Sequence, residues 1–343
     1  MIELEDDHLV FSFSDVHRDA RLTIGFQRTL RIPDDDRSYP LPPGLGEFPL
    51  RHVDDFTARI PESWERHGGV MLPMYQSEAL WLNFNGAYPF AVKVATGKID
   101  AITGEEWSEG LHRDPQDYMV TSRQPWLDGY CVDSGKIRQF VAMPLGRGYS
   151  VEEQITGEAE HGGLQIVAYP MKAAAFRKMR KRRLIRRSAS VADLGIALED
   201  AMDSAERSLD GDFSMGLAAG GNMDQEIYED PYRLDVWDTR HGSRCFVHIA
   251  SSLAWRSVTG EDPPGTPLGS REYTDNGMPW FDYYDADAVA LEGAKVLAAV
   301  KSVNEIGKYR GEHPLPENES VKPENVVSLG DPANPRRVRE GRF

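Results

Sequence analysis

Apolar and polar residues alternate in the N-terminal part of the chain. Leu9, Phe11 and Phe13 are separated by single positions. The same period of two is kept by a second series of apolar residues, namely Leu22, Ile24, Phe26, Leu30 and Ile32. A period of two is that of a β-strand with one buried face. We therefore predict strands here, with the mostly polar segment Asp15–Ala20 turning the chain between them.

Short apolar segments predict further strands in the middle of the chain. These segments are Ala79–Phe84, Ala91–Ala95, Ile99–Ile102, Ile137–Met143 and Gly163–Tyr169. Thr96 and Gly97 form a suitable hairpin turn between the second and the third. The β pattern returns after residue 211. It then predicts three more strands, at Asp224–Tyr228, Arg244–Ala250 and Trp255–Val258.

Two segments have the spacing of a helix instead. Between residues 190 and 210 apolar residues recur at steps of three and four, and Ser190 is placed to cap the first turn. A second helix is predicted over Ala288–Val303. Gly293 lies on its apolar side, where glycine costs ~1 kcal/mol relative to alanine in a helix interior.

Several short sequences occur more than once. Thr-Gly-Glu begins at Thr103, Thr156 and Thr259, and Pro-Trp-x-Asp follows the first and third copies. Arg-x-Phe-Val occurs at Arg138 and at Arg244, each upstream of a Thr-Gly-Glu. Repeated order of this kind indicates two related β units. Within each copy, we expect a strand to end at the β-branched residue and the glycine to supply the positive φ of the turn.

These patterns together predict a β-rich α+β protein with two related β units, an internal duplication, joined by a helical connector. Its expected parts are an N-terminal β-rich domain at 1–170, a basic-then-acidic helical connector at 171–212, and a C-terminal α+β unit at 213–310. Residues 311–343 contain five prolines and almost no aromatic residues. We therefore expect an extended tail there.

Composition narrows the class of protein. The 343 residues are 40% hydrophobic and 27% charged, which is ordinary for a soluble globular protein. No apolar run approaches the ~20 residues that a membrane span needs. The N-terminus is acidic, unlike a secretory signal, so a cytoplasmic location is expected. With only two cysteines, Cys131 and Cys245, a disulfide framework is not expected.

The net charge of −16 opposes general attraction to polyanions, but one segment is strongly basic. Residues 172–187 hold nine positive charges. This segment has three interpretations: pairing with the acidic helix that follows it, solvated exposure, or binding of a phosphate-rich partner such as RNA or an anionic membrane surface. The candidate anion-binding residues are Arg180, Lys181, Arg182 and Arg183.

Aromatic residues lie beside carboxylates in both Pro-Trp-x-Asp segments. The candidate ligand-binding residues there are Trp126, Asp128, Trp280, Asp282 and Tyr284. A carbohydrate hydrolase needs aromatic platforms and two carboxylates that flank one bond. The alternative is that each tryptophan fills a core and each aspartate caps a turn.

Arg147 is a further candidate for holding an anionic group. It lies in the glycine-containing turn Gly146–Ser150, which precedes a capping-box sequence. The dinucleotide-binding fingerprint is not met there, because Val151 stands where the third glycine is required.

The histidines lack metal-ligand spacing and no Gly-x-Ser-x-Gly motif is present. We therefore expect no metal and no cofactor. The sequence favours a non-enzymatic binding or structural protein whose ligand it does not name. The alternatives are a carbohydrate-active hydrolase and an anion- or RNA-binding module acting through residues 172–187. Homo-oligomerisation is left open.

Overall fold

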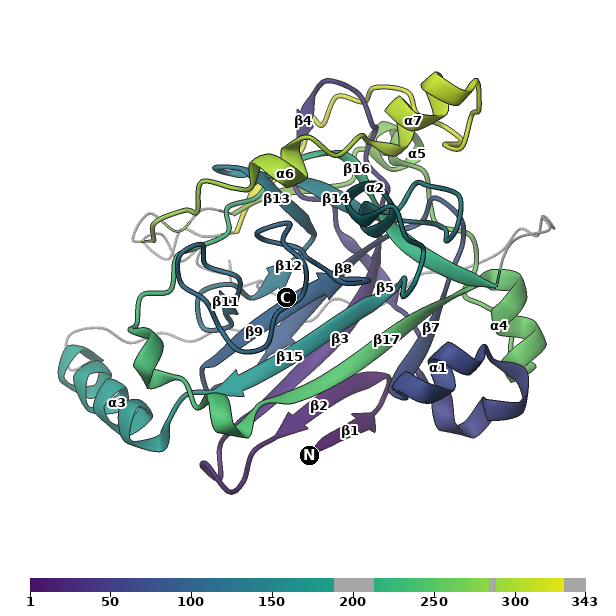
Figure 1. The fold of residues 1–343 in the computed structure, drawn as a ribbon. Coiled ribbons are helices and arrows are strands. Elements are labelled where there is room, and N and C mark those ends of the chain that lie inside the picture. The colour runs from purple at the N-terminus through teal and green to yellow at the C-terminus, as the bar shows by residue number, and fades with distance from the viewer. Residues whose placement is uncertain (188–212, 284, 286–287, 330–343) are drawn as a thin grey trace, which may run out of the picture.

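The computed structural model describes residues 1–187, 213–283, 285 and 288–329 (Figure 1). The helix predicted at 190–210 and the candidate Tyr284 lie outside these residues. Seven α-helices and three short 3-10 helices accompany the strands in the described residues. The β-rich α+β class predicted from the sequence is therefore confirmed.

Strands β1 to β17 form one large sheet in the described part of the chain, and β18 and β19 form a small second one. The strands are β1 (Ile2–Glu5), β2 (His8–Ser12), β3 (Arg21–Thr29), β4 (Ser38–Tyr39), β5 (Gly44–Glu47), β6 (Arg51–His52), β7 (Val70–Met74), β8 (Ala79–Asn85), β9 (Phe90–Thr96), β10 (Ile99–Asp100), β11 (Met119–Val120), β12 (Trp126–Leu127), β13 (Gly129–Asp133), β14 (Lys136–Pro144), β15 (Leu164–Pro170), β16 (Ser214–Asp224), β17 (Ser243–Ser251), β18 (Trp280–Asp282) and β19 (Val326–Ser328).

Helices lie around the sheet in Figure 1, with α3 at one end and α1 and α4 at the other. The helices are η1 (Val53–Arg59), α1 (Glu62–His67), α2 (Val151–Thr156), α3 (Ala173–Arg187), η2 (Leu234–Val236), η3 (Thr239–His241), α4 (Ser252–Thr259), α5 (Ser270–Asp275), α6 (Lys295–Ala298) and α7 (Val303–Arg310).

The period-two segments form β2 and β3, which pair with each other in the large sheet. Phe11, Leu22, Ile24 and Phe26 are fully buried, as the alternation in β2 and β3 predicts. The hairpin at Thr96 is also confirmed, since Ile99 of β10 pairs with Thr96 and Gly97 has a φ of +55°.

Strands from both sides of residues 171–212 pair with each other. β14 pairs antiparallel with β16, and β15 lies between β9 and β17. β7 pairs parallel with β17. Residues 1–170 and 213–251 therefore share one sheet, and the predicted duplication into two β units is not confirmed.

The three Thr-Gly-Glu copies have a local explanation. Gly104, Gly157 and Gly260 all have positive φ, of 69°, 77° and 77°. The second and third copies end helices α2 and α4, so the expectation that a strand precedes the turn is wrong for them.

The threonine side chain accounts for the rest of the motif in these two copies. The hydroxyl of Thr259 donates to the Trp255 carbonyl (2.8 Å) and accepts from the Glu261 amide (3.0 Å). Thr156 makes the equivalent bonds at the end of α2. The recurrence therefore reflects helix-ending chemistry.

Three predicted elements differ from the structure. Trp255–Val258 belongs to helix α4, whose first turn is capped by the Ser251 hydroxyl. Of the segment Asp224–Tyr228, only Asp224 is in a strand, as the last residue of β16. The helix predicted at 288–303 is replaced by the short α6 and the start of α7. Gly293 prevents it, because its φ is +75° and a Cβ there would lie 2.4 Å from the Asp133 amide nitrogen.

The described part of the predicted tail lies against the body of the protein. The Ser77 hydroxyl donates to the Pro314 carbonyl (2.7 Å), and the Asp34 amide donates to the Asn318 side chain (2.8 Å). Val321 is buried, and β19 pairs with β18. In the described residues, none of the helices has the length and apolar character needed to cross a membrane.

Candidate functional site

Asp128 is buried in this fold. It lies between β12 and β13 with 3% of its surface exposed. Its carboxylate accepts a hydrogen bond from the Gln225 side-chain amide (2.6 Å), and its own amide donates to the same side chain (3.2 Å). Burial raises the pKa of Asp128 to about 7, against the opposing effect of the Gln225 hydrogen bond.

The two candidate tryptophans occupy different surroundings. Trp126 is half-buried in β12, which pairs with β8. Trp280 is fully buried in β18, near the rings of Tyr39 and Tyr273. Asp282, two residues further on, is exposed. The aspartates of the two Pro-Trp-x-Asp segments therefore differ sharply in their access to solvent.

The structure does bring parts of these two segments together. The Trp126 ring contacts the edge of Tyr283 with a centroid separation of 4.8 Å. Arg123 forms an ion pair with Asp285 at 3.0 Å. The ring contact and the ion pair together hold the segment around Trp126 against the segment around Tyr283.

Arg147 is exposed in the turn before α2. Its carbonyl accepts a hydrogen bond from Arg310 at the end of α7. The capping box predicted after it is present, because the Ser150 hydroxyl accepts from the Glu153 amide and the Glu153 carboxylate accepts from the Ser150 amide. The turn at 146–150 therefore forms the start of helix α2.

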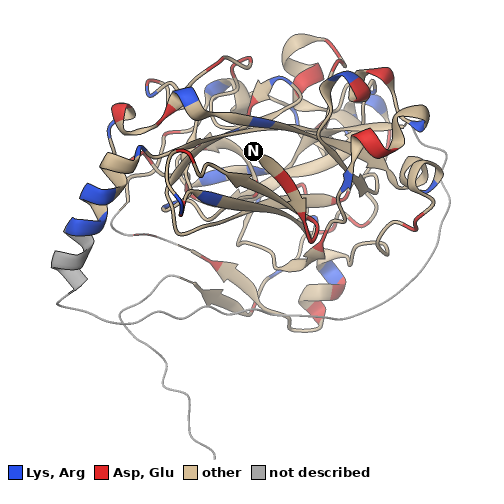
Figure 2. Ribbon diagram, turned by 90° about the horizontal axis from the view of Figure 1, so that it is seen from below, with Lys and Arg blue, Asp and Glu red and all other residues tan. Residues whose placement is uncertain are grey.

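The basic segment forms helix α3, which projects from one end of the fold (Figures 1 and 2). Its first turns are attached to the body. Phe176 is buried against the rings of Tyr88 (4.2 Å) and His17 (5.1 Å). The Lys172 amide and ammonium donate to the backbone carbonyls of residues 236 and 235, both at 2.8 Å.

The described basic side chains of α3 are exposed. They are Arg177, Lys178, Arg180 and Lys181. Arg180 is 3.8 Å from the carboxylate of Asp19, a pair that is more than a third exposed on both sides and therefore weak. The candidates Arg182 and Arg183 belong to the same helix.

An open depression of about 580 Å³ lies at the base of α3. Its lining comes from the loop after β10, from Lys172, and from the η2–η3 region. Charges of both signs line it: Lys172 and Arg233 with Glu109 and Asp235.

Beside this depression lies a buried ionic network that the sequence patterns do not single out. Lys93 of β9 is 1% exposed, and its ammonium donates to Asp117 (2.6 Å) and to the carbonyl and hydroxyl of Ser108 (2.9 and 3.2 Å). Asp117 also holds the exposed ring of His112, with 2.8 Å between Nδ1 and the carboxylate. The signal in the sequence is a single lysine between Val92 and Val94.

The chemistry of this network is restricted by its hydrogen bonds. A Ser–His pair requires a free ring nitrogen to accept the serine proton. Ser108 faces His112 Nδ1 at 3.5 Å, the nitrogen already bonded to Asp117. Lys93 is likewise engaged by a carboxylate. The arrangement positions the loop and orients His112, and it does not activate Ser108.

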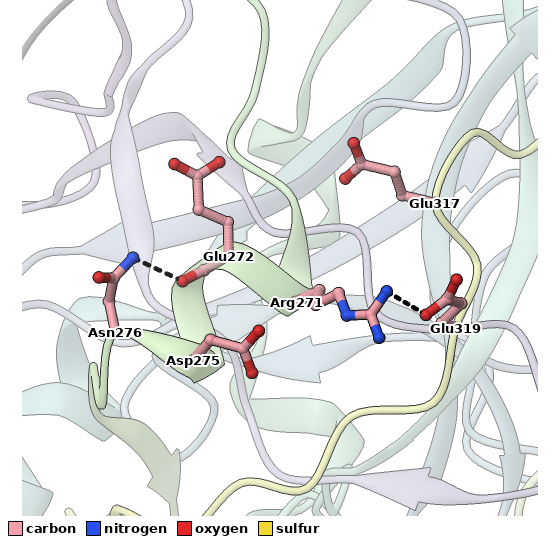
Figure 3. A pocket seen from close by; sticks show the side chains of 6 residues that line it. All are labelled: Arg271, Glu272, Asp275, Asn276, Glu317 and Glu319. Atoms are coloured by element: carbon pink, nitrogen blue, oxygen red, sulfur yellow. Dashed lines mark hydrogen bonds and ion pairs between the residues drawn. The ribbon is translucent and has the colours of Figure 1, made fainter.

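A second depression, of about 490 Å³, is drawn in Figure 3. Four carboxylates line it: Glu272 and Asp275 of α5, and Glu317 and Glu319 of the C-terminal segment. Arg271 pairs with Glu319, and the Asn276 side chain donates to the backbone carbonyl of Glu272. No group of three potential metal ligands is arranged around a common point in the described residues.

Comparisons with known proteins find no match, whether the chain is compared with family models, with curated proteins or with solved structures.

Proposed function

We propose that this protein is a binding protein that engages RNA through helix α3. The main support for this proposal is the way in which α3 is attached to the body of the protein. Its base is fixed by Phe176 and Lys172, whereas Arg177, Lys178 and Lys181 extend into solvent. A rigid support that presents clustered cations lowers the entropic cost of binding a polyanion.

The distribution of charge along α3 favours phosphate groups over a lipid surface. An interfacial membrane helix needs a continuous apolar face opposite its basic face. After Phe176, eight of the eleven residues of α3 are basic, and the apolar residues among them are Met179, Leu184 and Ile185. Six of the eight basic residues of α3 are arginines, whose planar guanidinium groups bind phosphate in a bidentate manner.

The competing interpretation is structural. The sequence after α3 contains many carboxylates, which are Asp193, Glu199, Asp200, Asp203, Glu206 and Asp210. If these neutralise α3, the basic residues contribute ~0–1 kcal/mol per exposed pair to stability and bind nothing.

A charge-neutralising variant separates the two interpretations. Arg180, Lys181, Arg182 and Arg183 are replaced together by glutamine. The matched control replaces Lys136, Lys295, Lys308 and Lys322, which are exposed and lie outside α3. Both variants remove four positive charges from a net charge of −16. Binding to single-stranded RNA is measured by fluorescence anisotropy over a range of salt concentrations.

We expect the α3 variant to lose most of its affinity while the control binds like the unmodified protein. The slope of log K against log [salt] should fall by about 3, since each phosphate contact contributes ~0.7 for a single strand. The proposal is overturned if both variants bind equally, or if the unmodified protein binds anionic vesicles but not RNA. Lower stability of the α3 variant alone, with unchanged RNA binding, would establish the structural interpretation.

Asp128 is buried and already hydrogen-bonded. This favours RNA binding through α3 over carbohydrate hydrolysis at the Pro-Trp-x-Asp segments.

A further inference from the structure

Three histidines from distant parts of the chain meet beside α1. His67 ends α1, His161 lies in the loop before β15, and His248 lies on β17. The centroid of the His67 ring is 5.3 Å from that of His161 and 6.4 Å from that of His248. Phe246 contacts His67 at 4.6 Å.

The innermost ring ties α1 to β17. His248 stacks on Trp64 of α1 with centroids 4.6 Å apart and an angle of 22° between the rings. Its Nε2 donates to the Gly68 carbonyl at 3.0 Å. His248 is 5% exposed, so a proton added to this ring would place a charge inside the contact between helix and strand.

The surrounding charges give this cluster only partial compensation. His161 Nε2 is 3.6 Å from Glu160, which also pairs with Lys98. His161 Nδ1 is buried without a hydrogen-bond partner among the described residues. From α2, the carboxylate of Glu152 accepts the backbone amides of residues 161 and 162.

Basic charge from α1 adds to the repulsion. Arg66 is next to His67 and disfavours a second positive charge there. It pairs with Glu62 of the same helix at 2.7 Å, on the exposed surface. No carboxylate on α1, β17 or the loop before β15 is within ion-pair distance of His248 in the described residues.

We propose that His67, His161 and His248 form an acid-sensitive latch that holds η1 and α1 against β17 at neutral pH and releases them on acidification. Released in this way, the segment 53–68 would take Val53 and Trp64 out of a small apolar cluster. That cluster contains Val53, Trp64, Met71 and Trp255 and is distinct from the main core.

The effect of pH on His67 and His248 follows mainly from their burial. Burial, helped by the neighbouring His67 and His161, lowers the pKa of His248 to about 4, against the opposing effect of the Gly68 hydrogen bond. Burial and His161 also lower the pKa of His67. Since both pKa values are below the ordinary 6.5, the closed state resists protonation while the open state accepts it. The latch is therefore fully stable above pH 6.5 and weakens as the pH falls towards 4.

Opening of the latch would also affect the residues at the start of β16, which follow α3 in the sequence. Phe213, the first described residue after α3, contacts the edge of Trp64 at 5.4 Å. Opening of the latch removes this contact and frees the start of β16 from α1. The pH would therefore determine whether the start of β16 is held against α1.

Hydrogen exchange of the intact protein tests the proposal. Exchange in peptides covering 53–68 is followed by mass spectrometry at pH 7.5 and pH 5.0, with rates corrected for intrinsic pH dependence. The population of the open state should rise roughly 30-fold at pH 5.0, as expected for one group with a pKa of 6.5 when open and about 4 when closed. Peptides of β14 should remain protected at both pH values.

Two variants and a control complete the test. His248→Phe keeps an aromatic ring against Trp64 and removes the titrating group, so the pH-dependent rise in exchange should largely disappear. His67→Phe, at a half-buried position, serves the same purpose with less risk to folding and should reduce the rise. His313→Gln, an exposed position, should leave it unchanged. Equal protection of 53–68 at the two pH values in the unmodified protein would overturn the proposal, and so would an unaltered pH response in the two phenylalanine variants.

Discussion

Asp117 and Asp128 are both almost completely buried, but their carboxylates are stabilised in different ways. Asp117 accepts a charged hydrogen bond from the Lys93 ammonium at 2.6 Å and also holds the His112 ring. Among the described residues, the Asp128 carboxylate accepts a hydrogen bond from the neutral side-chain amide of Gln225 and from no cation. Burial therefore raises the pKa of Asp128 to about 7, since a neutral donor compensates little of the cost of burying a charge.

The comparison shows why a carboxylate cannot be assigned a role from its sequence neighbours. In the sequence, Asp128 lies two residues after Trp126, among the aromatic and acidic residues typical of a surface ligand site. Asp117 lies in an unremarkable loop, yet it belongs to the buried ionic network beside the depression at the base of α3. Three substitutions test how differently the two carboxylates depend on their partners.

Replacing Lys93 should have the largest effect. Lys93→Met leaves Asp117 buried without its cation, which should lower the free energy of unfolding by ~3–5 kcal/mol. The measurement is urea denaturation at neutral pH. The double variant Lys93→Met, Asp117→Leu should recover most of this loss, because no unpaired charge remains. Equal instability of the single and double variants would show that packing, and not charge, is what Lys93 supplies.

Replacing Asp128 should change the pH dependence of stability. Its pKa is raised in the folded state, so its contribution to stability is complete below the unfolded value of 3.8 and is lost as the pH rises towards about 7. Asp128→Asn keeps the hydrogen bond to Gln225 without a titrating proton. We expect the variant to gain on the unmodified protein by up to ~1.4 kcal/mol per pH unit across this interval.

Denaturation at pH 4, 5, 6, 7 and 8 checks this prediction for Asp128. The two proteins should be nearly equally stable at pH 4, and the variant should be the more stable at pH 8. Parallel curves at all five pH values would contradict a raised pKa for Asp128.

Removing the His112 ring should have the smallest effect. The side chain is 54% exposed although its partner Asp117 is 6% exposed. Exposed pairs contribute at most ~1 kcal/mol, and Asp117 retains its bonds to Lys93 and to the His112 amide. His112→Ala should therefore reduce the unfolding free energy by less than ~1 kcal/mol. A loss as large as that of Lys93→Met would mean that the ring closes the network against water.

Sequence periodicity predicted the strands well where one face is buried. The alternation of Leu9, Phe11 and Phe13 identified β2 because it depends only on side chains of one strand. Thr-Gly-Glu also had a local cause, but helix ends and strand ends both use a glycine with positive φ, so the motif did not distinguish them.

Features that depend on distant segments could not be read from the sequence. Gly293 ends a predicted helix because the backbone at Asp133 approaches it closely. Lys93 is buried because the loop carrying Ser108 and Asp117 covers it. Trp126 meets Tyr283 through the folding of two segments that no periodicity connects.

The pairing of β14 with β16 and of β15 with β17 also determines when the sheet can be completed during synthesis. A nascent chain that has reached residue 170 contains β14 and β15, but each strand has one edge with no partner. Unpaired edges of this kind invite association with other chains. The sheet closes only after the ribosome has released residues 214–251, so the early part of the protein must be kept apart from its neighbours until then.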